Sequence, residues 1–411
     1  MHKKTDLKYG KAFCDIELPD KTDRLSIREP VSFIDKKKFV VDFSKALPEN
    51  LPNCPAISIV VADKTRLCGY KTYLPWILEI LHLKGIENRQ ITFFIAYGTH
   101  ARQSDEECLN TYGNIYQTHR FIHHDCNDKA LFTGLGNTRK GTKVHIRKDL
   151  LKSNLIITFG ALSHHYFAGY GGGRKLLFPG LGYKPDIYQN HGLFLDQNLK
   201  KLSPGCQPGN LENNPLARDL KEIDDFIEPQ RVSIHGILDS KAKVCQLIIG
   251  KTYNDFLTAG KTLDSFYKTM TDKQYELIIA SCGGFPKDIN FIQAHKAINN
   301  AAMFVKDKGS LIVLAECIDG IGSDTFIKYF NYGTFNQAFN ILEKDYKGNG
   351  GTALSMMTKT SRINIFLKTD LNDKICKTIG VKKIKVSMIQ TLIKEFQHDM
   401  ACIENASLLI R

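Results

Sequence analysis

Tryptophan is almost absent from this sequence of 411 residues, which contains only one. The sequence also lacks the usual signals for membrane insertion and secretion. No apolar run approaches the length that is needed to cross a bilayer. No apolar segment follows the polar residues 1–6, so a signal peptide is not expected. We therefore expect a cytoplasmic protein that has no membrane partner.

The eleven cysteines contain no Cys-x-x-Cys pair and no other metal-ligand spacing. An odd number of scattered thiols is typical of reduced cysteines in a cytosolic protein. The formal net charge is +13, but the densest basic runs, 36–38 and 382–385, are too short to form a nucleic-acid-binding arm. Nucleic acid is therefore not an expected partner, whereas small anionic ligands suit the positive charge.

Two common nucleotide-binding motifs are also missing. Lys175 follows Arg174 and precedes Leu176, so the magnesium-binding hydroxyl of a P-loop is absent. The residues after the first buried strand, 62–64, lack the Gly-x-Gly-x-x-Gly of a nicotinamide-dependent dehydrogenase. These absences argue against a P-loop enzyme and against a dehydrogenase of that kind.

What the sequence does contain is one dense cluster of chemically useful residues, 163–175. The adjacent His164 and His165 lead into a glycine-rich loop that ends in Lys175. The backbone amides of Gly171–Gly173 can form a nest for phosphate, although an ordinary phosphate-binding turn has the same composition. Lys175 can be an electrostatic clamp or a nucleophile, and the histidines can carry protons or bind a metal.

Three β-branched apolar runs, 57–62, 91–96 and 155–160, predict buried parallel strands. Ligands of open α/β sheets bind at the carboxyl ends of such strands. Asp63 and Arg66 follow the first strand, His100 follows the second, and the cluster 163–175 follows the third. We expect these side chains to meet, although Asp63 also suits a helix cap and Arg66 a surface position.

A second alternation of strands and helices begins near residue 272, with strands predicted at 275–280, 310–315 and 363–367. Gln293 and Lys296 lie one helical turn apart and share a face, which is also compatible with a solvated helix. The fold class is therefore α/β, with domains at 1–271 and 272–411. Each is expected to have a mainly parallel sheet covered by helices, with the active site in the cleft between them.

The order and spacing of these motifs resemble the nickel-dependent lactate racemase family. In that family a histidine precedes the glycine-rich loop, a lysine ten positions later carries a covalently attached cofactor, and a further histidine ligates nickel. His165, Lys175 and His191 stand at those places. The resemblance recurs in four more motifs: Asp63-x-x-Arg66, Gly98-x-His100, the Gly-Gly-Phe-Pro turn at 283–286, and Gln293-x-x-Lys296.

The resemblance implies a chemistry. The cofactor would be a nickel-pincer nucleotide of the pyridinium-3,5-bisthiocarboxylic acid mononucleotide type, attached to Lys175 and made by enzymes of the host. The substrate would be a small 2-hydroxycarboxylate, inverted at C2 by proton-coupled hydride transfer with His100 and His165 as proton carriers. Further roles follow by the same resemblance: substrate binding by Arg66, Gln293 and Lys296, and cofactor binding by Asp63, Gly171, Gly172 and Gly173.

The chain departs from the family at one place. Lactate-specific members carry a tryptophan in the second domain, but Trp76 lies in the first, and the corresponding segment 349–354 is small and predicted to be flexible. This predicts a substrate larger than lactate. The alternatives are a lactate racemase proper, or a non-catalytic carrier of nickel or cofactor, which would have no need of His100, Arg66 and Lys296.

Overall fold

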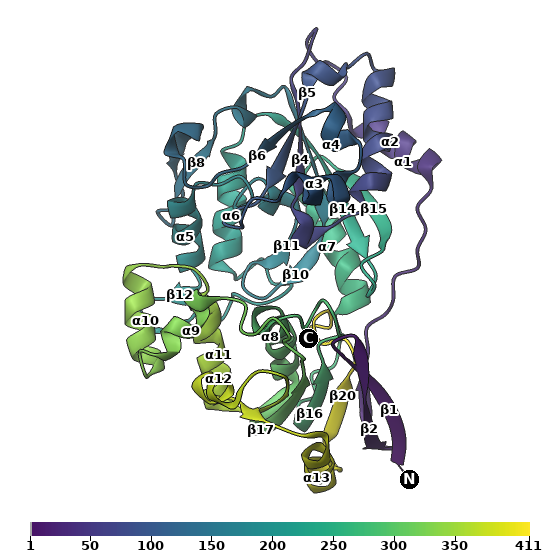
Figure 1. The fold of residues 1–411 in the computed structure, drawn as a ribbon. Coiled ribbons are helices and arrows are strands. Elements are labelled where there is room, and N and C mark those ends of the chain that lie inside the picture. Colours follow the sequence, from purple (N-terminus) through teal and green to yellow (C-terminus); the bar gives the residue numbers. More distant parts are fainter. Residues whose placement is uncertain (1) are drawn as a thin grey trace. The chain divides into compact units, whose positions relative to one another are not determined.

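The computed structural model describes residues 2–411 and contains two compact units (Figure 1). The central unit comprises Glu29–Leu193 and Pro204–Asp264, and the terminal unit comprises the chain up to Arg28, Phe194–Ser203 and Ser265–Arg411. The expected domain ranges, 1–271 and 272–411, assign the segments up to Arg28 and Phe194–Ser203 to the N-terminal domain. The assignment of the cofactor and the catalytic histidines to the first range, and of substrate contacts to the second, stays a prediction.

The central unit is built on a six-stranded sheet in the order β15-β14-β9-β4-β5-β6. Neighbouring strands are parallel except for β15, which runs antiparallel to β14. Every residue of β4 is buried, as the unbroken apolar run predicts for a strand covered on both faces. The strands are β4 (Ile57–Ala62), β5 (Ile91–Ala96), β6 (Arg120–His123), β9 (Leu155–Ala161), β14 (Gln230–Leu238) and β15 (Val244–Gly250).

Helices and two small hairpins complete this unit. Helix α1 packs with α2, and α5 packs with α6 (Figure 1). Ser104 caps α3 in a capping box with Glu107. The helices are α1 (Lys36–Ala46), α2 (Tyr70–Leu83), α3 (Asp105–Tyr112), α4 (Ile115–Thr118), α5 (Lys184–Gly192), α6 (Pro215–Asp225) and α7 (Tyr253–Tyr267), whose residues from Ser265 on belong to the terminal unit. The hairpins are β7 (Phe132–Asn137) with β8 (Lys143–Arg147) and β10 (Ser163–His165) with β11 (Gly169–Gly171).

The terminal unit has its own six-stranded sheet, in the order β19-β18-β17-β16-β20-β3, and all its pairings are parallel. Two short antiparallel pairs accompany it: β1 (His2–Tyr9) with β2 (Ala12–Pro19), and β12 (Leu195–Asp196) with β13 (Lys201–Leu202). The sheet strands are β3 (Asp23–Leu25), β16 (Tyr275–Ser281), β17 (Val305–Leu314), β18 (Asn364–Lys368), β19 (Lys382–Lys383) and β20 (Met400–Ile403).

Alternation along β16 divides the core of the terminal unit in two. Ile278 and Ala280 face one cluster, which includes residues of α8, α10 and α11. Leu277 and Ile279 face the other, which includes residues of β1, β2 and α13. The helices are α8 (Phe291–Ala301), α9 (Asp324–Phe330), α10 (Phe335–Lys344), α11 (Gly350–Arg362), α12 (Asp373–Thr378) and α13 (Val386–Phe396).

The predicted fold class is confirmed, because both units are α/β structures whose sheets are mainly parallel and covered by helices. Within residues 2–411, no helix combines the length and the apolar character that a membrane crossing demands.

Candidate active site

The ends of strands β4 and β5 bring Asp63 and His100 together. Asp63 caps the short turn Lys64–Arg66, and its Oδ1 accepts hydrogen bonds from the backbone N–H of Thr65 at 2.8 Å and from the Thr65 hydroxyl at 2.6 Å. The other oxygen, Oδ2, lies 2.6 Å from His100 Nδ1. Burial raises the pKa of Asp63, but the hydrogen bonds from His100 and Thr65 outweigh it and hold this pKa below the ordinary value.

This pairing fixes the protonation pattern of His100. An ionised carboxylate can only accept, so the shared hydrogen belongs to His100 Nδ1 and the lone pair of the neutral ring lies on Nε2. The His100 side chain is 51% exposed, whereas that of Asp63 is 4% exposed. Asp63 therefore holds the ring in place as well as capping the turn, and a direct contact of Asp63 with the cofactor stays a prediction.

His165 has the opposite pattern. It lies at the end of β10, where its Nδ1 accepts the backbone N–H of Ala168 at 3.3 Å and that of Phe167 at 3.5 Å. Because Nδ1 is an acceptor, the hydrogen of the neutral ring belongs on Nε2. His100 and His165 thus present complementary Nε2 atoms, one able to take a proton and the other able to give one.

The glycines before Lys175 are explained by close packing of the loop. Gly172 has a φ of +80°, and a Cβ at this position would lie well inside contact distance of the Ala161 carbonyl. Gly173 has a φ of +55°, and its Cβ would come within 2.9 Å of the Phe256 ring. Protein atoms therefore fill the space beside both residues, and an amide contact of Gly171–Gly173 with a cofactor phosphate stays a prediction.

Gly172→Ala is expected to destabilise the protein by about 2 kcal/mol or more, because it combines left-handed backbone strain with a backbone clash. The control is Gly192→Ala, where a Cβ meets nothing within 4 Å and the backbone is helical. Chemical denaturation of both variants gives the comparison. Equal stability of Gly172→Ala and wild type would contradict the packing account.

The Phe167 ring is a common neighbour of three predicted site residues. Its centroid lies 4.4 Å from that of His165 and 5.2 Å from that of His191, both edge to face. Lys175 Nζ lies 5.7 Å from the same ring. His165, Lys175 and His191 are thus gathered around an aromatic side chain that the sequence analysis did not single out. Its position inside the glycine-rich motif was the available signal.

The environment of Lys175 favours a neutral amine. Burial, together with the nearby cations Arg66 and Arg174, lowers the pKa of Lys175 to about 7. Arg174 is itself buried, lies over the rings of Tyr253 and Phe256, and donates to the Tyr253 hydroxyl at 2.9 Å. An amine of this kind is nucleophilic near neutral pH.

His191 is also held neutral. Burial, together with the charge of Lys175, lowers its pKa to about 4. Its Nδ1 lies 2.6 Å from the Ile187 carbonyl, which can only accept, so Nδ1 carries the hydrogen and Nε2 carries the lone pair. An unprotonated ring nitrogen is the form that ligates a metal.

Helix α5, which carries His191, is anchored by two buried polar residues. Asp186 accepts from both the backbone N–H and Nδ1 of His145, at 2.9 and 2.8 Å. Asn190, which is fully buried, donates to Asp219 at 2.9 Å. Neither anchor was predicted from the sequence, because the partners lie on other elements, β8 and α6.

The predicted substrate residues Gln293 and Lys296 lie on α8 of the terminal unit. Lys296 Nζ donates to Gln293 Oε1 at 2.7 Å, which confirms that the two side chains share a helix face. Their part in substrate binding stays a prediction.

The expectation of a small, flexible segment at 349–354 is wrong. Residues from Gly350 form the buried N-terminal part of α11. A Cβ on Gly350 would meet Leu342 and Tyr329, and one on Gly351 would meet the Tyr346 hydroxyl and the Phe194 ring. The glycines are needed because bulky neighbours already occupy the space, so this segment is tightly packed.

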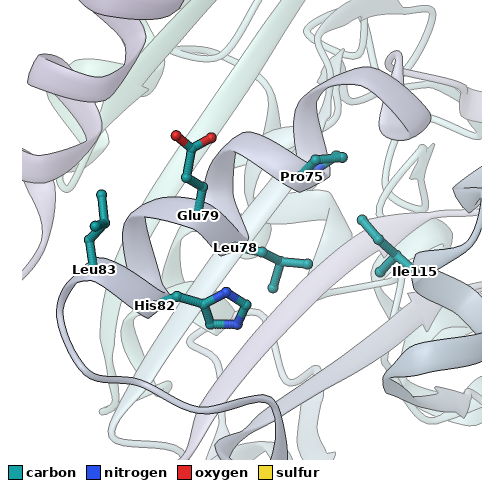
Figure 2. A pocket seen from close by; sticks show the side chains of 6 residues that line it. All are labelled: Pro75, Leu78, Glu79, His82, Leu83 and Ile115. Carbon is teal, nitrogen blue, oxygen red and sulfur yellow. The ribbon is translucent and has the colours of Figure 1, made fainter.

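Two further observations concern ligand sites. A surface cavity of about 510 Å³ is lined by side chains of α2 and by Ile115, and none of the predicted site residues lines it (Figure 2). In the part of the chain that the structure describes, no group of three or more His, Cys, Asp or Glu side chains is placed to hold a metal ion. The predicted nickel site involves one imidazole only, because the resemblance assigns the other ligands to the cofactor.

Comparison with known proteins places these residues in a family. Residues 9–202 match the model of the lactate racemase N-terminal domain, and residues 270–349 match that of the lactate racemase C-terminal domain. A lactate racemase of Thermoanaerobacterium thermosaccharolyticum is 27% identical over 79% of this chain and 77% of its own length. A lactate racemase of Lactiplantibacillus plantarum is 29% identical over 70% of this chain and 66% of its own length.

Solved structures agree on the fold. The structure of the lactate racemase apoprotein from T. thermosaccharolyticum has a TM-score of 0.85 with 22% identity, and the match covers 99% of both chains. A crystal structure of a Thermotoga maritima protein has a TM-score of 0.67 with 15% identity, covering 93% of this chain and 99% of the other. The two family models and the two lactate racemase relatives lead to one conclusion: the chain belongs to the lactate racemase family.

Proposed function

We propose that this chain is a racemase or epimerase that inverts C2 of a 2-hydroxyacid with the help of a nickel-pincer nucleotide. The observation that carries the proposal is that the hydrogen bonds of His100 and His165 favour opposite tautomers. Inversion needs one group that removes the hydroxyl proton and another that returns a proton, and neutral rings with opposite Nε2 atoms suit these tasks.

The residues around Phe167 fit the proposed cofactor. Lys175 offers an amine whose pKa of about 7 suits covalent attachment, and His191 offers an unprotonated Nε2 for nickel. When bound, the cofactor would supply an acceptor for hydride from C2. Lys175 and His191, which both lie next to Phe167, would hold it.

The remaining roles belong to side chains that bind and orient the substrate. His100 Nε2 would take the proton of the substrate hydroxyl, while Asp63 stabilises the charged ring that forms. Arg66, at the tip of β4, would bind the carboxylate through its guanidinium fork. Gln293 and Lys296 are proposed to add contacts to the same substrate. His165 Nε2–H would return a proton when the product forms.

We further propose that the protein is cytoplasmic and receives its cofactor from host enzymes that synthesise it. All eleven cysteines are free thiols and ten of them are buried, a state that a reducing compartment maintains.

The test is a panel of single-enantiomer 2-hydroxyacids deuterated at C2 and incubated with holo-protein from a host that makes the cofactor. Chiral chromatography should detect the opposite enantiomer, and mass spectrometry should find the deuterium kept at C2, because hydride leaves and returns without exchange. His100→Ala and His165→Ala should each lower turnover by roughly 10²-fold or more.

The panel contains lactate, a dicarboxylate, a sugar acid and an aromatic lactate. The prediction of a substrate larger than lactate rested on a flexible segment at 349–354, but Gly351 instead packs closely against Tyr346 and Phe194. A higher specificity constant for lactate than for every larger acid would overturn that prediction and leave the mechanism intact. No inversion of any acid by nickel-loaded, covalently modified protein would favour the carrier alternative.

A further inference from the structure

The two adjacent histidines of the central motif point in opposite directions. In the β10–β11 hairpin, His164 pairs with Tyr170 and His165 pairs with Gly169. Successive side chains of a strand lie on opposite faces, so His164 cannot share the surroundings of His165. The His164 side chain is only 7% exposed. The proposed function leaves His164 without a role.

A single carboxylate on α7 binds the hairpin on the His164 side. Asp264 Oδ1 lies 2.7 Å from His164 Nε2 and accepts from the Tyr170 hydroxyl at 2.8 Å. Asp264 Oδ2 also accepts from Tyr170, at 2.9 Å. His164 and Tyr170 are cross-strand partners, so one side chain of α7 is bonded to both strands of the hairpin.

A glycine on helix α7 leaves room for the hairpin to pack against it. Gly260 lies one turn before Asp264, and a Cβ at Gly260 would come within 3.2 Å of the Tyr170 ring. Glycine at that position lets the ring lie against the helix, with its hydroxyl directed at the carboxylate one turn further on. The ring and the hydroxyl of Tyr170 are thus held by the same helix face.

The hairpin depends on such an anchor. Each of its strands has three residues, and a pairing this short has little stability of its own. His165 occupies the last position of β10, and the Ala168 amide that donates to its Nδ1 belongs to the connection between the strands. Loss of the anchor on α7 would therefore loosen the hairpin and disturb both the position of His165 and the hydrogen bond that Ala168 donates to it.

We propose that Asp264 is a positioning residue for the reaction, which through His164 and Tyr170 sets the place and the Nε2–H form of His165. This inference rests on the proposed function, in which His165 Nε2–H is the proton donor. It assigns the paired histidines to different tasks: His165 acts on the substrate, and His164 binds the hairpin to α7.

The test compares Asp264→Asn and Tyr170→Phe with a charge-matched control, Asp42→Asn, which removes an exposed carboxylate paired with Lys38 on α1. Holo-protein of each variant is assayed for kcat, KM, covalent adduct and nickel. Asp264→Asn should lower kcat by roughly 10²-fold, the size expected when a catalytic group is misplaced by about 1 Å. KM, adduct and nickel should stay within about twofold of wild type, since the attachment and metal residues are not moved.

A second readout is independent of activity. Nitrogen-15 NMR of histidine-labelled holo-protein reports the tautomer of each ring, with His165→Gln and His164→Gln used for assignment. In wild type His165 should be in the Nε2–H form, and in Asp264→Asn it should become a mixture, while His100 is unchanged. Tyr170→Phe, which removes one hydroxyl only, should give a smaller change in the same direction.

Two results would overturn the inference. One is an unchanged His165 tautomer with an unchanged kcat in Asp264→Asn. The other is a loss confined to KM or to cofactor loading. If wild-type holo-protein inverts no acid on the panel, the proposed function fails, while the NMR comparison still decides whether Asp264 positions His165.

Discussion

Holo-protein with His191→Ala is expected to lose at least nine-tenths of its nickel, by the usual effect of removing a metal ligand, while it keeps the covalent adduct on Lys175. The reason lies in the ring itself. Its Nδ1 hydrogen is bound to the Ile187 carbonyl, and its pKa of about 4 leaves Nε2 unprotonated throughout the neutral range. Metal content by inductively coupled plasma mass spectrometry and adduct by intact mass give the two measurements.

The matched controls are His100→Ala and His165→Ala, which should retain nickel and lose turnover. In the proposed function His100 and His165 carry protons, so neither is assigned to the metal. Equal loss of nickel in all three variants would show that the division between metal ligand and proton carriers is wrong. Full nickel in His191→Ala would show that the metal has another protein ligand.

Nickel retention by wild type should also follow pH in a defined direction. The pKa of His191 is lowered from its ordinary value, so the ring stays neutral as pH falls from 7 to about 5 and takes up a proton only near pH 4. Retention should therefore be flat over the first range and fall in the second.

Much of the fold was predictable because its strands are local features. Strands β4 and β5 coincide with the predicted runs 57–62 and 91–96, since buried parallel strands are continuous apolar segments. The N-terminal strands were harder to recognise. In β2 buried and exposed residues alternate, and its polar residues gave a weaker signal than the unbroken apolar runs of β4 and β5 did.

The candidate site was predictable only in part. Motif spacing and the resemblance pointed to His165, Lys175 and His191, but spacing says nothing about which nitrogen of a ring carries the hydrogen. That depends on partners fixed by tertiary structure, such as Asp63 for His100. Asp264 is 100 residues from His164 in sequence, so no local pattern connects them. Gly350 and Gly351 were misread because a glycine-rich segment is either flexible or tightly packed, and only its neighbours decide which.

Replacing Lys175 with alanine is expected to abolish the cofactor adduct and to reduce turnover to background. Peptide mapping of wild-type holo-protein should place the adduct on the peptide that contains Lys175. Lys251→Ala, at an exposed position before α7, is the control and should keep both adduct and activity. An adduct on a different lysine, or an unchanged mass of Lys175→Ala relative to modified wild type, would contradict the assignment.

The reactivity of this amine gives a sharper form of the same prediction. Burial and two neighbouring cations lower the pKa of Lys175 from 10.5 to about 7. At pH 7 about half of these amines are therefore neutral, whereas a lysine of ordinary pKa is neutral in roughly one molecule in three thousand. In protein that lacks the cofactor, acetylation of Lys175 by a water-soluble ester should rise with a midpoint near pH 7, while exposed lysines continue to gain reactivity up to about pH 10.

Arg66→Gln removes one of the two cations and should move the midpoint upward, because the ammonium form then meets less repulsion. A Lys175 profile that follows the exposed lysines would remove the chemical basis for attachment at this residue.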